Sequence, residues 1–136
     1  MEALVVVALL WAVFGRNSAP APVEEPSVST MTGIVPLSMV PGHYLRADAA
    51  RAFERAVSQS NIPRVNSSFR TREQQEKLYA LYLAGKGNLA AKPGTSKHEF
   101  GLAIDARGST EWESAMSANG WRRTVNSEPW HWEYFG

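Results

Sequence analysis

The sequence predicts an α+β fold in which a small antiparallel sheet is backed by helices. Three observations predict it: some segments place apolar residues at helical spacing, others alternate apolar and polar residues, and the two kinds follow one another in an α+β order. With 136 residues, 44% of them hydrophobic, and no internal repeat, the chain has room for one domain.

The first helix is expected over residues 47 to 59. Its apolar residues follow the i, i+3, i+4, i+7, i+8 pattern of a buried stripe, at Ala49, Ala52, Phe53, Ala56 and Val57. A strand over residues 65 to 69 is expected to follow and to deliver Arg70.

A second helix is expected to begin at Thr71, because Thr71 and Gln74 form a capping box. Its apolar face is formed by Leu78, Leu81 and Tyr82. Gly85 is expected to end it. Residues 85 to 97 then form a loop, which is either the wall of a groove or a plain surface loop.

A third, short helix is expected from Glu111 to Asn119, with Thr110 and Glu113 as its capping box and Gly120 as its stop. The final strands are predicted over residues 121 to 125 and 130 to 134. Alternation in the last strand places Trp130, Trp132 and Tyr134 on one face and His131 and Glu133 on the other.

Two short motifs carry ligand-type side chains, and the first is Ser96-Lys-His-Glu-Phe-Gly-Leu-Ala-Ile-Asp105. On one helix His98 and Asp105 would lie about 10 Å apart along the axis, and on one strand more than about twice that. Neither geometry lets the two side chains meet at one ion. A turn must therefore lie between them, and Gly101 is the residue best able to supply it.

The second motif is Glu128-Pro-Trp-His-Trp132, in which Pro129 favours an extended backbone at Glu128. Together the motifs offer two imidazoles and one carboxylate, from His98, Asp105 and His131. This is a ligand set of catalytic zinc, because three protein ligands leave a fourth position for water. Glu128 would remain free to act as a base. The absence of cysteine excludes a thiolate site, a cysteine nucleophile and disulfides.

Both motifs resemble those of the VanY-type D-alanyl-D-alanine carboxypeptidases, zinc peptidases that trim peptidoglycan stem peptides. The upstream segments Leu45–Ala50 and Ser67-Ser-Phe-Arg-Thr71, with Gln75, continue the resemblance. It covers about residues 36 to 136 and implies a hedgehog/DD-peptidase-like fold with the zinc site on the sheet. The chain departs from the family where Ser68 and Phe69 stand at positions that often hold Gly and Tyr.

The resemblance also implies roles for individual residues. It assigns His98, Asp105 and His131 as zinc ligands, Glu128 as general base and acid, Arg70 as the group that stabilises the oxyanion, and Ser96 and Gln75 as substrate-binding groups. The expected cofactor is therefore Zn2+. The expected partner is a peptidoglycan stem peptide, and a monomer is expected.

The reaction implied is removal of the C-terminal D-alanine from D-Ala-D-Ala ends. One alternative is an endolysin-like L-alanyl-D-glutamate endopeptidase with the same zinc site, which the Glu-Pro-Trp-His-Trp ending disfavours. Another is a non-catalytic, zinc-stabilised cell-wall binding module. Such a module has no need of a carboxylate at Glu128, three residues before a ligand.

Charge divides unevenly along the chain, whose formal net charge is +1. Residues 1 to 35 carry −2 and residues 36 to 136 carry +3. This excess comes without a basic run or interleaved aromatic residues, so nucleic acid is not an expected partner. It would help the domain approach an anionic cell wall.

The N-terminal segment, residues 1 to 15, contains an apolar run over residues 3 to 14. As a helix this run spans about 18 Å, short of the ~30 Å hydrocarbon core of a bilayer. It is an atypical signal peptide, a short anchor that contacts the membrane, or the product of a mis-assigned start, with translation beginning near Met31. Residues 16 to 35 are expected to be a flexible linker and residues 36 to 136 the zinc peptidase domain, in an extracytoplasmic location.

Overall fold

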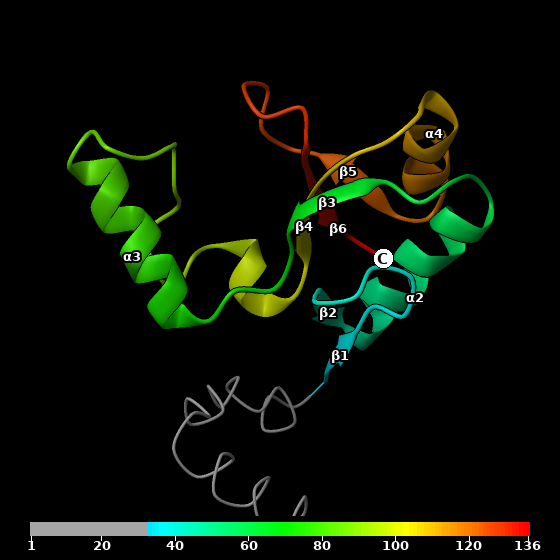
Figure 1. Ribbon diagram of the computed structural model, residues 1–136, viewed down its shortest axis with the longest axis horizontal. Coiled ribbons are helices and arrows are strands. Elements are labelled where there is room, and N and C mark those ends of the chain that lie inside the picture. The colour runs from blue at the N-terminus through cyan, green and yellow to red at the C-terminus, as the bar shows by residue number, and fades with distance from the viewer. Residues whose placement is uncertain (1–32) are drawn as a thin grey trace, which may run out of the picture. The chain divides into compact units, whose positions relative to one another are not determined.

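A four-stranded antiparallel sheet forms the centre of the fold, in the computed structural model, which describes residues 33–136 (Figure 1). Its strand order is β3-β4-β6-β5, and the strands are β3 (Arg64–Ser67), β4 (Ala103–Arg107), β6 (His131–Tyr134) and β5 (Trp121–Arg123). A second, two-stranded antiparallel sheet consists of β1 (Ile34–Pro36) and β2 (Tyr44–Arg46). The predicted α+β class is confirmed.

Two helices, α2 (Ala47–Ser58) and α4 (Thr110–Ala118), pack against each other beside the four-stranded sheet (Figure 1). The predicted stripe of α2 is buried, as periodicity indicated: Ala49, Ala52, Phe53, Ala56 and Val57. It joins Ile104 of β4 and the aromatic rings of Trp112, Trp121 and Trp132 in one core. This core covers one face of β4 and β6, and Asp105 and His131 lie on the opposite face.

Phe53→Ala is expected to lower the free energy of unfolding by about 3–5 kcal/mol, because it leaves a cavity in a closely packed core. Phe53 is fully buried in α2, with 0% exposure. Urea unfolding followed by circular dichroism would measure the loss. Leu83→Ala is the matched control, since Leu83 is 67% exposed and its truncation should change stability by less than about 0.5 kcal/mol. Equal effects of the two substitutions would contradict this account of the core.

The helix α3 (Arg72–Leu83) begins as predicted, with the complete capping box. The Thr71 side chain accepts a hydrogen bond from the Gln74 amide at 3.1 Å, and the Thr71 amide donates to Gln74 Oε1 at 3.0 Å. Gly85, just past the end of the helix, has a φ of +69°, which glycine adopts without strain.

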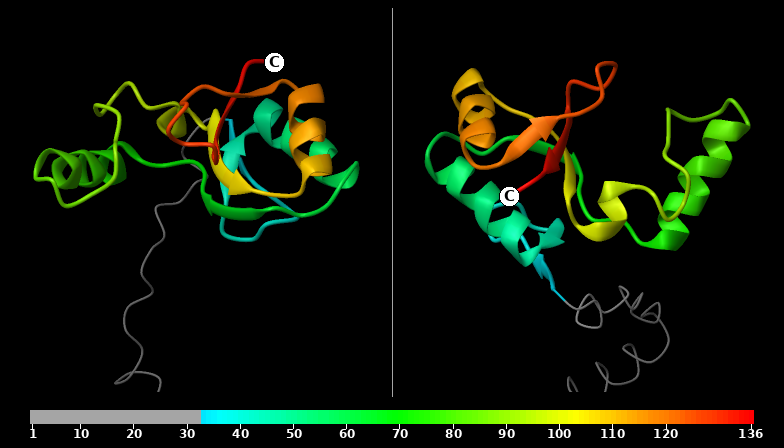
Figure 2. Two further views of the ribbon diagram at one scale, coloured as in Figure 1. Left: turned by 90° about the horizontal axis from the view of Figure 1, so that it is seen from above. Right: turned by 180° about the vertical axis from the view of Figure 1, so that it is seen from behind.

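The predicted apolar face of α3 does not pack on the core, however. Leu78, Leu81 and Tyr82 are 37%, 46% and 38% exposed, and Gln75 is the buried residue of the helix. Figure 2 shows the reason: α3 extends away from the sheet and from the other two helices. Helical periodicity identifies residues that share a face, but it does not say whether another element covers that face.

Several boundaries differ from prediction. Ile34 pairs with Arg46 in the small sheet, so the last residues of the predicted linker belong to the folded domain. The strand β3 ends at Ser67, before the predicted residue 69. The N-cap of α4 is Ser109, whose side chain accepts from the Trp112 amide at 3.2 Å, because it precedes Thr110 and caps equally well.

The segment 1–15 and most of the linker 16–35 lie outside the residues that the structure describes. Within residues 33–136, none of the helices has the length and hydrophobicity needed to cross a lipid bilayer.

Candidate metal centre and active site

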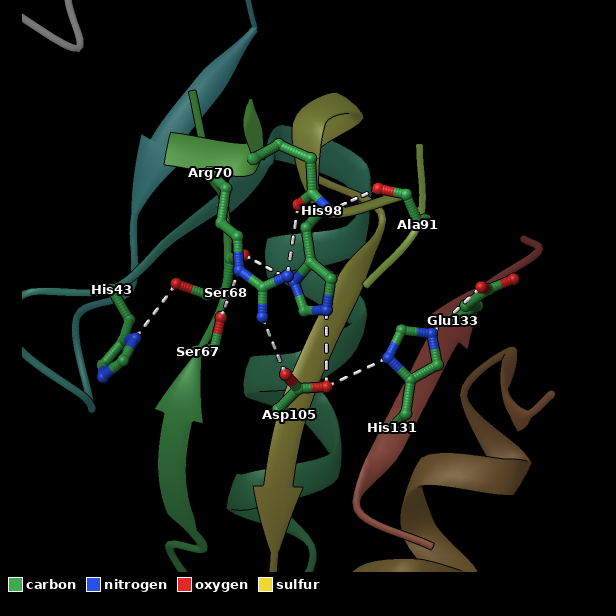
Figure 3. A network of polar contacts seen from close by, with 10 residues as sticks. His43, Ser67, Ser68, Arg70, Ala91, His98, Asp105, His131 and Glu133 are labelled. Atoms are coloured by element: carbon green, nitrogen blue, oxygen red, sulfur yellow. Dashed lines mark hydrogen bonds and ion pairs between the residues drawn. The ribbon is translucent and has the colours of Figure 1, made fainter. Parts of the chain in front are cut away.

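Three side chains from two strands and a short helical turn converge on the polar face of the sheet (Figure 3). Asp105 of β4 and His131 of β6 are direct cross-strand partners, so their side chains point to the same side of the sheet. His98 lies on the 3-10 turn η2 (Lys97–Phe100), just before β4. The predicted turn is present: Gly101 has a φ of +68°, and a Cβ there would meet the Arg46 amide nitrogen at 2.5 Å.

The donor atoms have the spacing of a zinc site. Asp105 Oδ1 lies 3.3 Å from His98 Nε2 and 3.0 Å from His131 Nδ1. In a tetrahedral site with metal–ligand bonds of about 2.0–2.1 Å, neighbouring donors are about 3.3 Å apart. The donor atoms of all three residues lie within 4.8 Å of one another. These residues therefore fit a single zinc ion, bound through two imidazoles and a carboxylate.

Each histidine has its second ring nitrogen occupied by a hydrogen bond. His98 Nδ1 donates to the carbonyl oxygen of Ser68 at 2.7 Å, and a carbonyl can only accept. This fixes the neutral His98 ring with Nε2 unprotonated and facing Asp105. His131 Nε2 lies 3.0 Å from Glu133 Oε1, on the side of the ring away from Asp105. Such outer contacts orient metal ligands and set their tautomers.

The electrostatics of the centre favour a bound cation. Burial by itself would raise the pKa of Asp105, but the contacts of its carboxylate with the His131 and His98 rings outweigh burial and hold that pKa well below its usual range. Burial would also lower the pKa of His131, yet its contacts with Asp105 and Glu133 raise it overall. Asp105 is therefore ionised at neutral pH, and zinc binding must displace any proton held by His131.

Arg70 contacts the ligand carboxylate from the other side. Its Nη2 donates to Asp105 Oδ2 at 3.0 Å, leaving Oδ1 for the metal, and its Nη1 donates to Gln75 Oε1 at 3.3 Å. Burial lowers the pKa of Arg70, and the nearby carboxylates of Asp105 and Glu128 oppose that shift. Because Nη1 and Nη2 each carry two N–H groups, these contacts leave one of each for another acceptor.

The centre lies in a pocket of about 510 Å³. Its polar lining consists of the three candidate ligands together with Arg70, Glu128 and Glu133. Its apolar lining includes Leu78 and Leu81 of α3 and Leu89 of the loop that follows. The loop 85–97 is thus a pocket wall, one of the two possibilities that its length allowed. The apolar face of α3 contributes to the same wall.

Glu128 is brought to this pocket by a tight turn before β6. The Glu128 carbonyl accepts from the His131 amide at 3.0 Å, and the Glu128 amide donates to the Val125 carbonyl at 3.0 Å. Residues 33–136 form no hydrogen bond to its carboxylate. Of the site's carboxylates, Glu128 is thus available to exchange protons with a substrate or a water.

Ser96 and Gln75 also line the pocket, but both side chains are buried. Gln75 is fully buried: its Oε1 accepts from Arg70 and its Nε2 donates to the Ala91 carbonyl at 2.9 Å. These contacts tie α3 and the pocket wall to the centre. Direct contacts of Ser96 and Gln75 with substrate stay predictions.

Sequence reasoning did not assign a role to Glu133 or to the Ser68 carbonyl. Alternation along the last strand placed Glu133 on the face of His131, which was the available signal. Nothing in the residue type at position 68 marks its backbone carbonyl as a partner of His98.

A His-Asp-His cluster beside a free carboxylate, all lining one pocket, fits the residue pattern of metal-dependent hydrolases. The family model VanY, D-alanyl-D-alanine carboxypeptidase, matches residues 42–123. The chain therefore belongs to the VanY family. The match ends before Glu128 and His131, and the fold brings these two residues to the centre.

Solved structures agree with this assignment. VanYB in complex with D-alanine-D-alanine is 26% identical, with a TM-score of 0.55 over 76% of this chain and 77% of that one. A VanY D,D-pentapeptidase solved in complex with Zn(II) is 23% identical, with a TM-score of 0.55 over 76% and 78%. A search of curated protein sequences finds no match.

The vancomycin resistance D,D-dipeptidase VanXYg, in complex with a D-Ala-D-Ala phosphinate analogue, is 24% identical with a TM-score of 0.64. The similarity covers 76% of this chain and 56% of VanXYg, so this chain spans little more than half of that protein. Together these neighbours confirm the predicted fold, and they do not favour the endolysin alternative.

Proposed function

We propose that this protein is a zinc-dependent carboxypeptidase that removes the C-terminal D-alanine from peptidoglycan stem peptides ending in D-Ala-D-Ala. The observation that carries the proposal is the convergence of His98, Asp105 and His131 beside the free carboxylate of Glu128 in one pocket. Membership of the VanY family supports the choice of substrate. The proposed substrate lies in the cell wall, and we accordingly propose an extracytoplasmic site of action.

The chain's residues divide the chemistry among them. His98, Asp105 and His131 would hold zinc, which when bound polarises a carbonyl and lowers the pKa of water to about 7. Glu128 takes the proton of the attacking water and passes it to the leaving amine. Its position in the pocket without a protein partner suits both transfers.

Arg70 has two tasks in this proposal. It fixes Asp105 through Oδ2, and its remaining N–H groups oppose the negative charge that collects on the former carbonyl oxygen. Because its guanidinium is anchored by Ser67, Gln75 and Asp105, little reorganisation is needed as the charge develops. Ser96, near the metal centre, is proposed to help hold the substrate's free carboxylate.

Mass spectrometry of a defined muropeptide tests the proposal. The full-length, zinc-loaded protein, incubated with a pentapeptide stem ending in D-Ala-D-Ala, is expected to release one terminal alanine. Protein stripped of metal by a chelator should release none, and added zinc should restore the reaction. A tetrapeptide stem lacking the last residue is the substrate control.

Other products would overturn the proposal in distinguishable ways. Cleavage between L-Ala and D-Glu would identify the L-alanyl-D-glutamate endopeptidase. An intact pentapeptide in the presence of bound zinc would identify the non-catalytic binding module.

A further inference from the structure

Glu133 is a further acidic side chain of the pocket, and the proposed reaction gives it no role. It lies two residues after His131 on β6, so both side chains emerge on the same face of the sheet. Its Oε1 is 3.0 Å from His131 Nε2, and the two are drawn as a contact pair in Figure 3. The side chain is 18% exposed and lines the pocket.

The two nitrogens of His131 face different partners. Nδ1 lies 3.0 Å from Asp105 Oδ1, the oxygen that His98 Nε2 also approaches, so Nδ1 points to the metal position. Nε2 points the opposite way, to Glu133. A neutral imidazole carries its proton on one nitrogen only, and metal binding at Nδ1 requires that proton to sit on Nε2. A carboxylate acceptor at Nε2 favours this tautomer and prevents the ring from turning over.

We infer that Glu133 is a positioning residue that holds His131 as the Nε2–H tautomer, so that Nδ1 is the zinc-binding atom. The inference rests on the proposed zinc site. The inference also gives the two histidines opposite tautomers. His98 would bind zinc through Nε2 while its Nδ1–H donates to the Ser68 carbonyl. His131 would bind zinc through Nδ1 while its Nε2–H donates to Glu133.

The contacts argue against two other roles for Glu133. As a general base Glu133 is the poorer candidate, because its Oε1 is engaged by His131, whereas the Glu128 carboxylate accepts no hydrogen bond within residues 33–136. As a fourth ligand it would have to approach the metal position, whereas its contact is with the nitrogen on the far side of the ring. The Ser68 carbonyl performs the matching task for His98, and no substitution can remove a backbone carbonyl. Glu133 is the outer contact that mutagenesis can test.

Zinc affinity, measured by competition with a chromophoric chelator, tests the inference on the full-length protein. Glu133→Ala is expected to weaken zinc binding about 10- to 100-fold, the usual effect of losing a contact to a ligand histidine. Glu133→Gln should retain most of the affinity, because the amide oxygen still accepts from Nε2–H. Glu113→Ala is the control: Glu113 is a half-exposed acid on α4 that pairs with Arg123 and lies outside this pocket.

Nitrogen-15 NMR of the zinc-loaded wild type provides a second readout that needs no substitution. It should show His131 protonated at Nε2 and His98 protonated at Nδ1. Wild-type zinc affinity in Glu133→Ala, or a His131 ring bound through Nε2, would overturn the inference. Failure of the wild type to bind zinc would instead overturn the proposed site, so the two failures are separable. If Glu133→Ala does not fold, the wild-type spectrum still decides.

Discussion

Replacing Glu128 by glutamine is expected to lower turnover of a D-Ala-D-Ala peptide by at least about 100-fold, the typical effect of losing a general base. Glutamine keeps the shape and the hydrogen-bonding capacity of the side chain but cannot accept a proton from water. The zinc content should stay at wild type, because Glu128 does not belong to the cluster of ligand atoms. Steady-state kinetics and metal analysis of the same preparation would measure both quantities.

The control for this substitution is Glu76→Gln, which changes an exposed carboxylate of α3 that does not line the pocket. It should leave both turnover and zinc content unchanged. Loss of zinc from Glu128→Gln would make Glu128 a ligand and some other group the base. Unchanged turnover would refute the mechanism.

His98→Ala should behave differently: the zinc content, the thermal stability and the turnover should all decline together. The substitution removes a ligand, and it also leaves the Ser68 carbonyl without its partner in a buried position. Wild-type protein purified without chelator should carry about one equivalent of zinc. A ligand present at 100 times its Kd stabilises the folded state by about 2.7 kcal/mol, so added zinc should raise the Tm of the wild type but not of the variant.

His43→Ala is the matched control, because His43 is the remaining histidine of the chain and lies outside the ligand cluster. It contacts the Ser68 hydroxyl at 3.0 Å and should bind zinc as the wild type does. Full zinc occupancy and an undiminished Tm gain in His98→Ala would contradict the ligand assignment.

The candidate metal centre was accessible to sequence reasoning because its geometry is local. The spacing of His98 and Asp105 requires a turn, glycine is the residue that permits one, and strand alternation then decides which side chains share a face. The cross-strand pairing of Asp105 with His131 confirms that inference. The stripe of α2 was predictable for the same reason, since a short periodic pattern fixes its buried residues.

What sequence could not supply depends on contacts between distant segments. The capping box of α3 is local and was predicted, but the exposure of Leu78 and Leu81 away from the core is a tertiary property. The contact of Arg70 with Asp105 depends on the path of a long side chain between strands. The predictions for the N-terminal segment 1–15 concern residues that the structure does not describe, and they stay predictions.

The separation of α3 from the core has a consequence for how this enzyme scaffold can change. The wall that α3 and its loop form is attached to the centre mainly through polar contacts: the buried amide of Gln75, and the Arg72–Glu99 ion pair at 2.6 Å, whose Glu99 also accepts from the Gly94 amide. Substitutions at Leu78, Leu81 or Leu89 would reshape that wall at little expense to core packing. Under the proposed function, this wall would set peptide selectivity and the sheet would hold the catalytic groups, so a new peptide preference would leave the catalytic groups in place.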